Sequence, residues 1–183
     1  MTRTRLGAAA VAALAAGALA VSASPASASA SSGYVSGADT YTDDFGDEGI
    51  LSTSSYSSSN ATCLWQIILL AEGANESDGT DFDMSDIDGH FGSNTQHATK
   101  RLQVSWGLAD SFSDADGKVG PNTFGYADSK LRYLGGSTAS GGNLHVRYQG
   151  TRYYFDVYRT DGKYRIYHND AWHTTSYTSN TCD

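Results

Sequence analysis

A ten-residue segment occurs twice in this chain and constrains its fold more than any other feature. Residues 86–95 (Asp-Ile-Asp-Gly-His-Phe-Gly-Ser-Asn-Thr) and 114–123 (Asp-Ala-Asp-Gly-Lys-Val-Gly-Pro-Asn-Thr) are identical at six of ten positions. Asp-Gly favours a tight turn, because glycine adopts positive φ without steric cost. The apolar residue anchors the loop, and Asn-Thr suits a helix N-terminus, where backbone N–H groups lack partners. Each copy therefore predicts a turn that leads into a helix.

The Asp-x-Asp-Gly sequence is shared with EF-hand calcium loops, but the rest of that pattern is missing. When the glycine is placed sixth, Met84 and Phe112 take the first position, and Thr95 and Thr123 take the twelfth. An EF-hand needs an oxygen ligand first and a bidentate Glu last. We predict no metal ion at these loops, and no cofactor elsewhere.

Three segments have the apolar pattern of helices. Residues 60–73 are apolar on nearly every side, which predicts a helix at the centre of the core, with Asn60 as its N-cap and Gly73 at its end. Residues 94–107 and 121–134 are amphipathic, and Pro121 suits a first helical turn. Their apolar stripes consist of Ala98, Leu102 and Trp106, and of Phe124, Ala127, Leu131 and Leu134.

The pattern changes to alternation after Gly141-Gly142. Residues 144–148, 153–157 and 164–166 alternate apolar and polar side chains, and Gln149-Gly150 and Asp161-Gly162 stand between them as turn signals. The sequence therefore predicts an α+β fold: a three-helix bundle followed by a small three-stranded antiparallel β-meander. The predicted domains are a helical domain over residues 59–137 and a Tyr-rich β module over residues 141–183.

The N-terminal part is expected to lie outside this fold. Arg3 and Arg5 precede an apolar run over residues 6–21, and small residues at 26, 28 and 30 offer cleavage sites. This order predicts a signal peptide over residues 1–30; the alternative, a membrane anchor, needs about 20 apolar residues. Residues 31–58 are rich in Ser and Gly and lack an apolar period, so we predict a flexible linker. The protein is expected to be secreted, extracellular or wall-associated, without a membrane span after processing.

Charge and cysteine content narrow the possible partners. Removal of Arg3 and Arg5 from 12 basic and 20 acidic residues leaves a net charge of −10, which argues against nucleic acid. Residues 61–130 hold eleven acids and four bases, whereas residues 131–183 hold four acids and six bases, which favours two modules. Cys63 and Cys182 are expected to form an intrachain disulfide in an oxidising compartment; a buried free thiol and an intermolecular bond are the alternatives.

The helical region resembles the peptidoglycan-binding domain family, a three-helix module found on bacterial wall hydrolases. Trp65-Gln66 and Gly73 stand where that family has a Leu-Gln pair and a Gly, and Phe124 stands where it has Trp. The match covers residues 59–134, and the acidic connections over residues 72–86 and 109–114 are longer than the family pattern. The overall arrangement also looks similar to small secreted proteins of actinobacteria, although the family has no counterpart of the Tyr-rich module. The matching loop residues are Asp88, Gly89, Phe91, Gly92, Asp116, Gly117, Val119, Gly120 and Pro121, and Thr95, Ala98, Leu102, Gln103 and Thr123 follow them.

This resemblance implies a ligand site in the groove between the second and third helices. Asn94, Thr95, Asn122 and Thr123 are the candidate hydrogen-bonding residues, unless they only cap the helices. Trp106 either stacks on a sugar or belongs to the core. In the β module, basic residues and tyrosines either bind anionic wall polymers or glycan or form an ordinary polar sheet face. These basic residues are Arg147, Arg152, Arg159, Lys163 and Arg165.

Catalysis is not expected. The five histidines are scattered, with only His168 and His173 near Asp170, and neither a His-Glu-x-x-His nor a Gly-x-Ser-x-Gly motif occurs. We therefore predict a non-enzymatic protein that binds peptidoglycan, through its stem peptide or its glycan. The alternative is a secreted protein-binding factor or inhibitor that acts through the Tyr-rich module.

Overall fold

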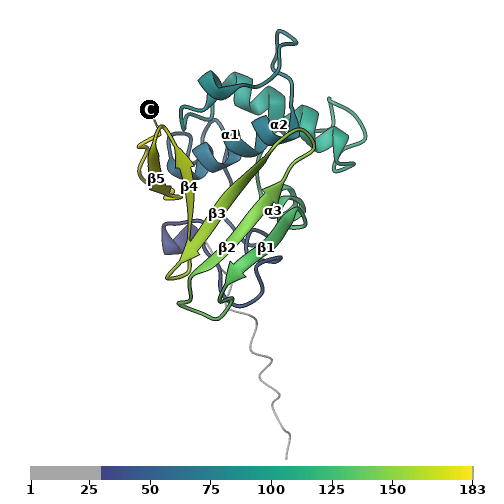
Figure 1. Cartoon of the computed structure of the whole chain (residues 1–183). Helices are drawn as coiled ribbons and strands as arrows, with labels where there is room; N and C mark the ends of the chain where they lie inside the picture. The colour runs from purple at the N-terminus through teal and green to yellow at the C-terminus, as the bar shows by residue number, and fades with distance from the viewer. Residues whose placement is uncertain (1–29, 183) are drawn as a thin grey trace, which may run out of the picture.

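The computed structural model describes residues 30–182, in which an antiparallel sheet packs against a central helix (Figure 1). The helices are η1 (Ala30–Ser32), α1 (Asn60–Glu72), η2 (Met84–Asp86), α2 (Ser93–Ser105) and α3 (Pro121–Asp128). The strands are β1 (Leu131–Gly136), β2 (Leu144–Gln149), β3 (Tyr154–Thr160), β4 (Lys163–His168) and β5 (Ala171–Thr174), paired in chain order. Apart from Ala30, the predicted signal peptide lies outside the described residues. None of the helices in residues 30–182 has the length and apolar character needed to cross a bilayer.

The predicted three-stranded meander is wrong, because the sheet within residues 30–182 has five strands. The third helix, expected over residues 121–134, ends at Asp128, and Leu131 begins β1. Leu131 is buried as expected, but it pairs with Tyr148 of β2 instead of lying on a helical stripe. Strand pairing overrides local helical spacing here. The fifth strand, β5, is too short to show an alternating pattern. The broader assignment to the α+β class remains consistent with the structure.

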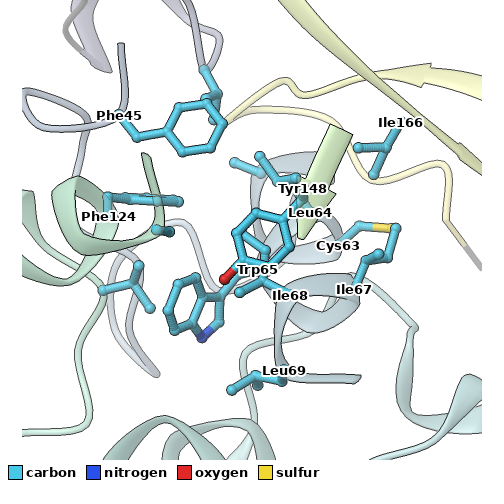
Figure 2. Close-up of a cluster of buried hydrophobic side chains, with 14 of the residues drawn as sticks. Phe45, Cys63, Leu64, Trp65, Ile67, Ile68, Leu69, Phe124, Tyr148 and Ile166 are labelled. Carbon is cyan, nitrogen blue, oxygen red and sulfur yellow. The ribbon is translucent and has the colours of Figure 1, made fainter. Parts of the chain in front are cut away.

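The central position of α1 is confirmed. Leu64, Trp65 and Ile68 are fully buried, and Figure 2 shows them between aromatic residues of other elements. Gly73 ends the helix at φ 70°, as predicted. The N-cap is Ser59 instead of Asn60, since the Ser59 hydroxyl accepts a hydrogen bond from the Thr62 N–H at 3.0 Å.

The prediction of a flexible linker over residues 31–58 is wrong. Val35, Phe45 and Leu51 are almost completely buried in the core. The Val35 N–H donates to the Thr175 carbonyl at 2.9 Å, and Leu51 pairs with Val119. The segment showed no period because it contacts the core through separate anchors instead of one regular element.

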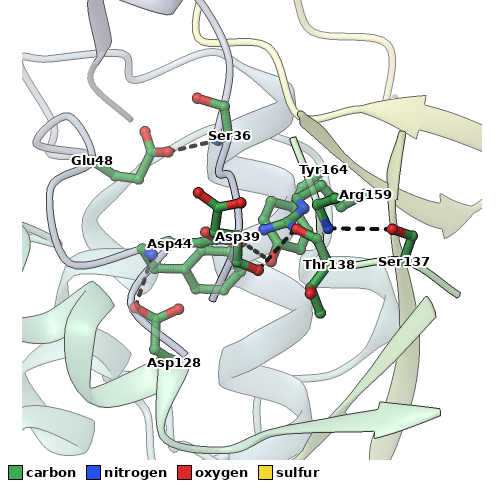
Figure 3. Close-up of polar contacts among 11 residues, drawn as sticks. Ser36, Asp39, Asp44, Glu48, Asp128, Ser137, Thr138, Arg159 and Tyr164 are labelled. Carbon is green, nitrogen blue, oxygen red and sulfur yellow. Dashed lines mark hydrogen bonds and ion pairs between the residues drawn. The ribbon is translucent and has the colours of Figure 1, made fainter. Parts of the chain in front are cut away.

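Buried polar groups also hold this N-terminal segment in place. Asp44 forms an ion pair with Arg159 and accepts a hydrogen bond from the Tyr164 hydroxyl (Figure 3). The Arg159 side chain is only 1% exposed, and its Nη2 donates to the Thr138 carbonyl at 2.6 Å. Charges buried this deeply require partners on every side, so they fix the segment against the sheet.

The disulfide between Cys63 and Cys182 is present within one chain, with the Cα atoms 6.4 Å apart. Both cysteines are fully buried in the same core cluster. That cluster combines side chains of residues 31–58, the helices and the sheet. The helical part and the strands therefore share one hydrophobic core.

Candidate functional site

A glutamine on α1 holds the first repeated loop. The Gln66 Oε1 accepts from the Gly89 N–H at 2.7 Å, and its Nε2 donates to Asp88 Oδ1 at 2.7 Å. The same Nε2 lies 3.1 Å from the His90 carbonyl oxygen. Gly89 has φ 71°, which glycine adopts without strain.

The second loop is held in the same way by a glutamine on α2. The Gln103 Oε1 accepts from the Gly117 N–H at 2.9 Å, and its Nε2 donates to Asp116 Oδ1 at 2.8 Å and to the Lys118 carbonyl at 2.9 Å. Gly117 has φ 65°. The sequence repeat therefore corresponds to a structural repeat, in which each helix fixes the loop that follows it.

The threonines and apolar residues of the motif belong to these internal networks. Thr95 and Thr123 are 3% and 4% exposed, and each hydroxyl donates within its own loop, to the His90 and Lys118 carbonyls at 3.3 Å. Phe91 is also buried, as is its counterpart Val119. The two threonines are not available to a ligand in this conformation.

The two asparagines lie on the surface. Gly92 and Gly120 are the N-caps of α2 and α3, so neither asparagine caps its helix. Asn94 Oδ1 accepts from the Ser77 hydroxyl at 3.0 Å. Asn122 lines a cleft of about 530 Å³ beside the second loop. The structure thus separates each exposed asparagine from the buried threonine that follows it.

Trp106 is the predicted ligand residue with the most distinctive surroundings. Its ring stacks on Tyr126, with the ring centroids 4.5 Å apart and an interplanar angle of 21°. The Lys130 Nζ lies 5.5 Å from the Trp106 ring centroid. Together with Arg101, these side chains line a cleft of about 500 Å³, the Trp106 cleft. Tyr126 was not among the predicted ligand residues, because nothing in α3 alone indicates that its ring stacks on Trp106.

The carboxylate of the Trp106 cleft is Glu72, and it is fully engaged. Its side chain is 1% exposed and forms an ion pair with Lys130 at 2.9 Å. It also accepts hydrogen bonds from the Tyr148 hydroxyl at 2.8 Å and the Thr151 hydroxyl at 2.7 Å. Burial and the adjacent Glu72 charge raise the pKa of Tyr148. Glu72 therefore stabilises the cleft and has no free position as a general base.

Three of the basic residues considered for polymer binding form ion pairs within the protein. Arg159 is buried with Asp44, Arg152 pairs with Asp81 at the surface, and Arg147 pairs with Asp156 at 2.7 Å. By strand register, Arg147, Lys163 and Arg165 lie on the face of the sheet opposite to the buried Leu144 and Val146.

The histidine pair lies in the β4–β5 hairpin, where His173 contacts the backbone of His168. The His173 Nε2 lies 3.0 Å from the His168 carbonyl oxygen, and burial lowers the pKa of His168. Across residues 30–182, no three His, Cys, Asp or Glu side chains gather closely enough to hold a metal ion.

No protein-family model, curated protein or solved structure matches this chain. The resemblance to the peptidoglycan-binding domain family therefore stays a prediction that rests on the motif residues.

Proposed function

We propose that this chain is a non-catalytic secreted protein that binds bacterial peptidoglycan through the Trp106 cleft. The observation that carries this proposal is the stacked Trp106–Tyr126 pair at the edge of a cleft that also holds Lys130 and Arg101. An aromatic face packs well on the C–H groups of a pyranose ring, while Arg101, the cleft cation that does not pair with Glu72, suits a carboxylate of a stem peptide. A concave site in which aromatic and polar side chains converge is a usual place for a ligand to bind.

The repeated loops support the class of ligand. Gln66 and Gln103 hold two equivalent Asp-Gly turns, and the motif that resembles the wall-binding family is thereby a coherent structural unit. The cleft lies beside the end of α2 and includes Trp106, a residue that the resemblance offers for sugar stacking. The engaged state of Glu72 supports binding without hydrolysis, because a glycosidase needs one carboxyl group free to donate a proton.

Sedimentation with purified, protein-free peptidoglycan tests the proposal. Protein produced without residues 1–30 is expected to bind saturably. Trp106→Ala and Tyr126→Ala are each expected to weaken binding about tenfold, since aromatic contacts contribute about 0.5–1.5 kcal/mol beyond the area they bury and about 1.4 kcal/mol corresponds to a factor of ten. Tyr153→Ala is the matched control, because Tyr153 is 54% exposed and lies outside the cleft.

Two outcomes would contradict the proposal. If the wild-type protein does not sediment although circular dichroism shows it folded, peptidoglycan is not its ligand. If a folded Trp106→Ala protein binds as tightly as Tyr153→Ala, the Trp106 cleft is not the site.

A further inference from the structure

The sheet has one face against α1 and one face toward solvent. Leu144, Val146 and Ile166 are fully buried on the inner face. The opposite face, here called the outer face, carries the cross-strand pairs His145–Tyr158, Tyr158–Arg165 and Tyr167–Trp172. Tyr154, Tyr167 and Trp172 are 59%, 54% and 41% exposed. Large aromatic side chains that are this exposed and lie together are typical of a ligand-binding or interaction surface.

The outer-face rings contact one another across four strands. His145 stacks on Tyr158 with ring centroids 4.3 Å apart and an interplanar angle of 7°. The ring of Tyr158 meets Trp172 edge-on at 4.9 Å, and Tyr167 lies 5.3 Å from Trp172. We call these four side chains the aromatic row. Because they support one another, the row presents a preorganised surface instead of separate mobile rings.

A shallow depression lies on each side of the Tyr158–Trp172 contact. One, of about 400 Å³, is also bounded by Asp156 and Tyr167. The other, of about 270 Å³, is also bounded by Thr160 and Arg165. Two depressions that share Tyr158 and Trp172 suit a ligand with more than one ring better than one compact ligand.

Arg165 lines the smaller depression and carries a buried polar atom that is not hydrogen-bonded to any described residue. Its Nε atom is buried, yet it has no hydrogen bond within residues 30–182. The nearby Arg147 differs, because its Nε donates to Asp156 at 2.7 Å and its guanidinium lies 4.1 Å from the Tyr154 ring centroid. A desolvated guanidinium nitrogen left without an acceptor is unfavourable. Because Arg165 also lines the depression of about 270 Å³, an incoming carboxylate would meet its guanidinium group there.

The charge of the outer face is opposite to that of the chain. The whole chain has a net charge of −8. On the outer face, by strand register, Arg132, Arg147, Lys163 and Arg165 stand against one acid, Asp156. Such a patch favours an anionic ligand, whereas two copies of this face would repel each other.

We propose that the outer face binds an acidic polysaccharide, with sugar rings on Trp172 and Tyr158 and a sugar carboxylate on Arg165. This inference goes beyond the proposed function, because the outer face and the Trp106 cleft share no lining residue. The two sites can therefore succeed or fail separately.

Affinity electrophoresis and titration calorimetry with polygalacturonate and hyaluronate test the proposal. The full secreted chain is expected to bind at least one of them. Trp172→Ala and Arg165→Gln should each weaken binding at least tenfold, whereas Arg152→Gln should not, because Arg152 pairs with Asp81 outside the outer face. Tyr167→Ala, a second exposed row position, covers the case in which Trp172→Ala fails to fold.

The ligand's charge is tested with methyl-esterified polygalacturonate, which keeps the backbone and masks the carboxylates. Wild-type protein should bind this ester as weakly as Arg165→Gln binds the free acid. Equal binding of ester and acid would overturn the role of Arg165. If folded wild-type protein binds none of these polysaccharides, the proposal fails and the surface is left to a protein partner. Trp106→Ala should retain polysaccharide binding, which separates this site from the peptidoglycan site.

Discussion

Gln66 and Gln103 are the residues on which the repeated loops depend. They are 1% and 6% exposed, and both atoms of each carboxamide group are hydrogen-bonded. A glutamine is suited to this position, because it offers a donor and an acceptor side by side, as a peptide group does. The backbone groups of the loops thus form hydrogen bonds with a glutamine side chain, because no helix or sheet partner is present for them.

Replacement of Gln66 by alanine is expected to lower the free energy of unfolding by about 2–4 kcal/mol. Several buried groups, including the Gly89 N–H, would lose their partner. Gln149→Ala, an exposed strand-end control, should change stability by less than about 0.5 kcal/mol. Urea unfolding measures both. Equal stability of the two variants would show that the loop does not need the glutamine.

The sequence located these loops but not the roles of their residues. Asp-Gly turns and helix starts follow from local rules, so Gly89 and Gly117 were placed correctly. Which polar residues face solvent depends on tertiary packing, and for that reason buried Thr95 and exposed Asn94 were assigned the same role. The stacking of Tyr126 on Trp106 joins two elements and has no signal in either alone.

Two buried carboxyl groups titrate far above their ordinary range. Asp128 is 1% exposed; burial, together with Asp44 and Asp43, raises its pKa to about 8. Its Oδ2 accepts from the Phe45 N–H at 2.8 Å, while Oδ1 lacks a partner within residues 30–182. Burial raises the pKa of Glu48 to about 7, although the Tyr177 hydroxyl donates a hydrogen bond to it. The Ser36 N–H donates a second one (Figure 3).

Stability is expected to fall as the pH rises. The folded protein holds the Asp128 and Glu48 protons more tightly than the unfolded chain, so their contribution is complete below about pH 4. It is lost as the pH passes through about 7 and 8. Asp128→Asn should lose less stability between pH 5 and pH 9, and it should exceed wild type at pH 9. Urea unfolding at pH 5, 7 and 9 measures this. If the free energy of unfolding rises with pH, and by the same amount in wild type and Asp128→Asn, the buried-acid interpretation is contradicted.

Secondary-structure elements are predicted best where an apolar pattern is compatible with only one kind of element. The helix α1 is apolar on every side, which only a central helix accommodates. Leu131 and Leu134 fit the apolar stripe of a helix as well as a strand. The pairing of β1 with β2 makes this segment a strand. In the N-terminal segment, the anchors Val35, Phe45 and Leu51 follow no period, so only the assembled core shows that they belong to it.

Phe45 provides a test of the N-terminal segment as an element of the fold. Its ring meets Tyr164 at 4.9 Å and Phe124 at 5.9 Å between centroids. Phe45→Ala is expected to cost about 3–5 kcal/mol, because it leaves a cavity in a packed core. Ile50→Ala, at a residue that is 47% exposed, is the control from the same segment and should cost far less. Thermal unfolding compares them, and a small effect at Phe45 would mean that the segment is only loosely attached.

The whole molecule is closed by the bond between Cys63 and Cys182, which lie 119 residues apart. A cross-link over so long a loop restricts the unfolded chain strongly. Because residues of every region share one core, unfolding is expected to be a single cooperative transition.

Replacement of both cysteines by serine is expected to lower the free energy of unfolding by about 2–4 kcal/mol. Calorimetry with and without a thiol reductant measures it. The reductant should lower the Tm of the wild-type protein toward that of the double variant and leave the variant unchanged. An unchanged wild-type Tm, with free thiols verified, would show that packing alone closes the molecule.

The pairing of Tyr34 with Ser176 brings together residues from opposite ends of the described chain. During translation, Tyr34 is synthesised long before Ser176. The helices and the β1–β2 hairpin can begin to form during synthesis, since their contacts are close in sequence. The Val35 N–H cannot form its hydrogen bond until the Thr175 carbonyl has been synthesised, so Val35 stays exposed until then. The last step of folding therefore belongs to the completed polypeptide, and a nascent chain that stalls before β4 is left with an unsatisfied N-terminal segment that chaperones and proteases can recognise.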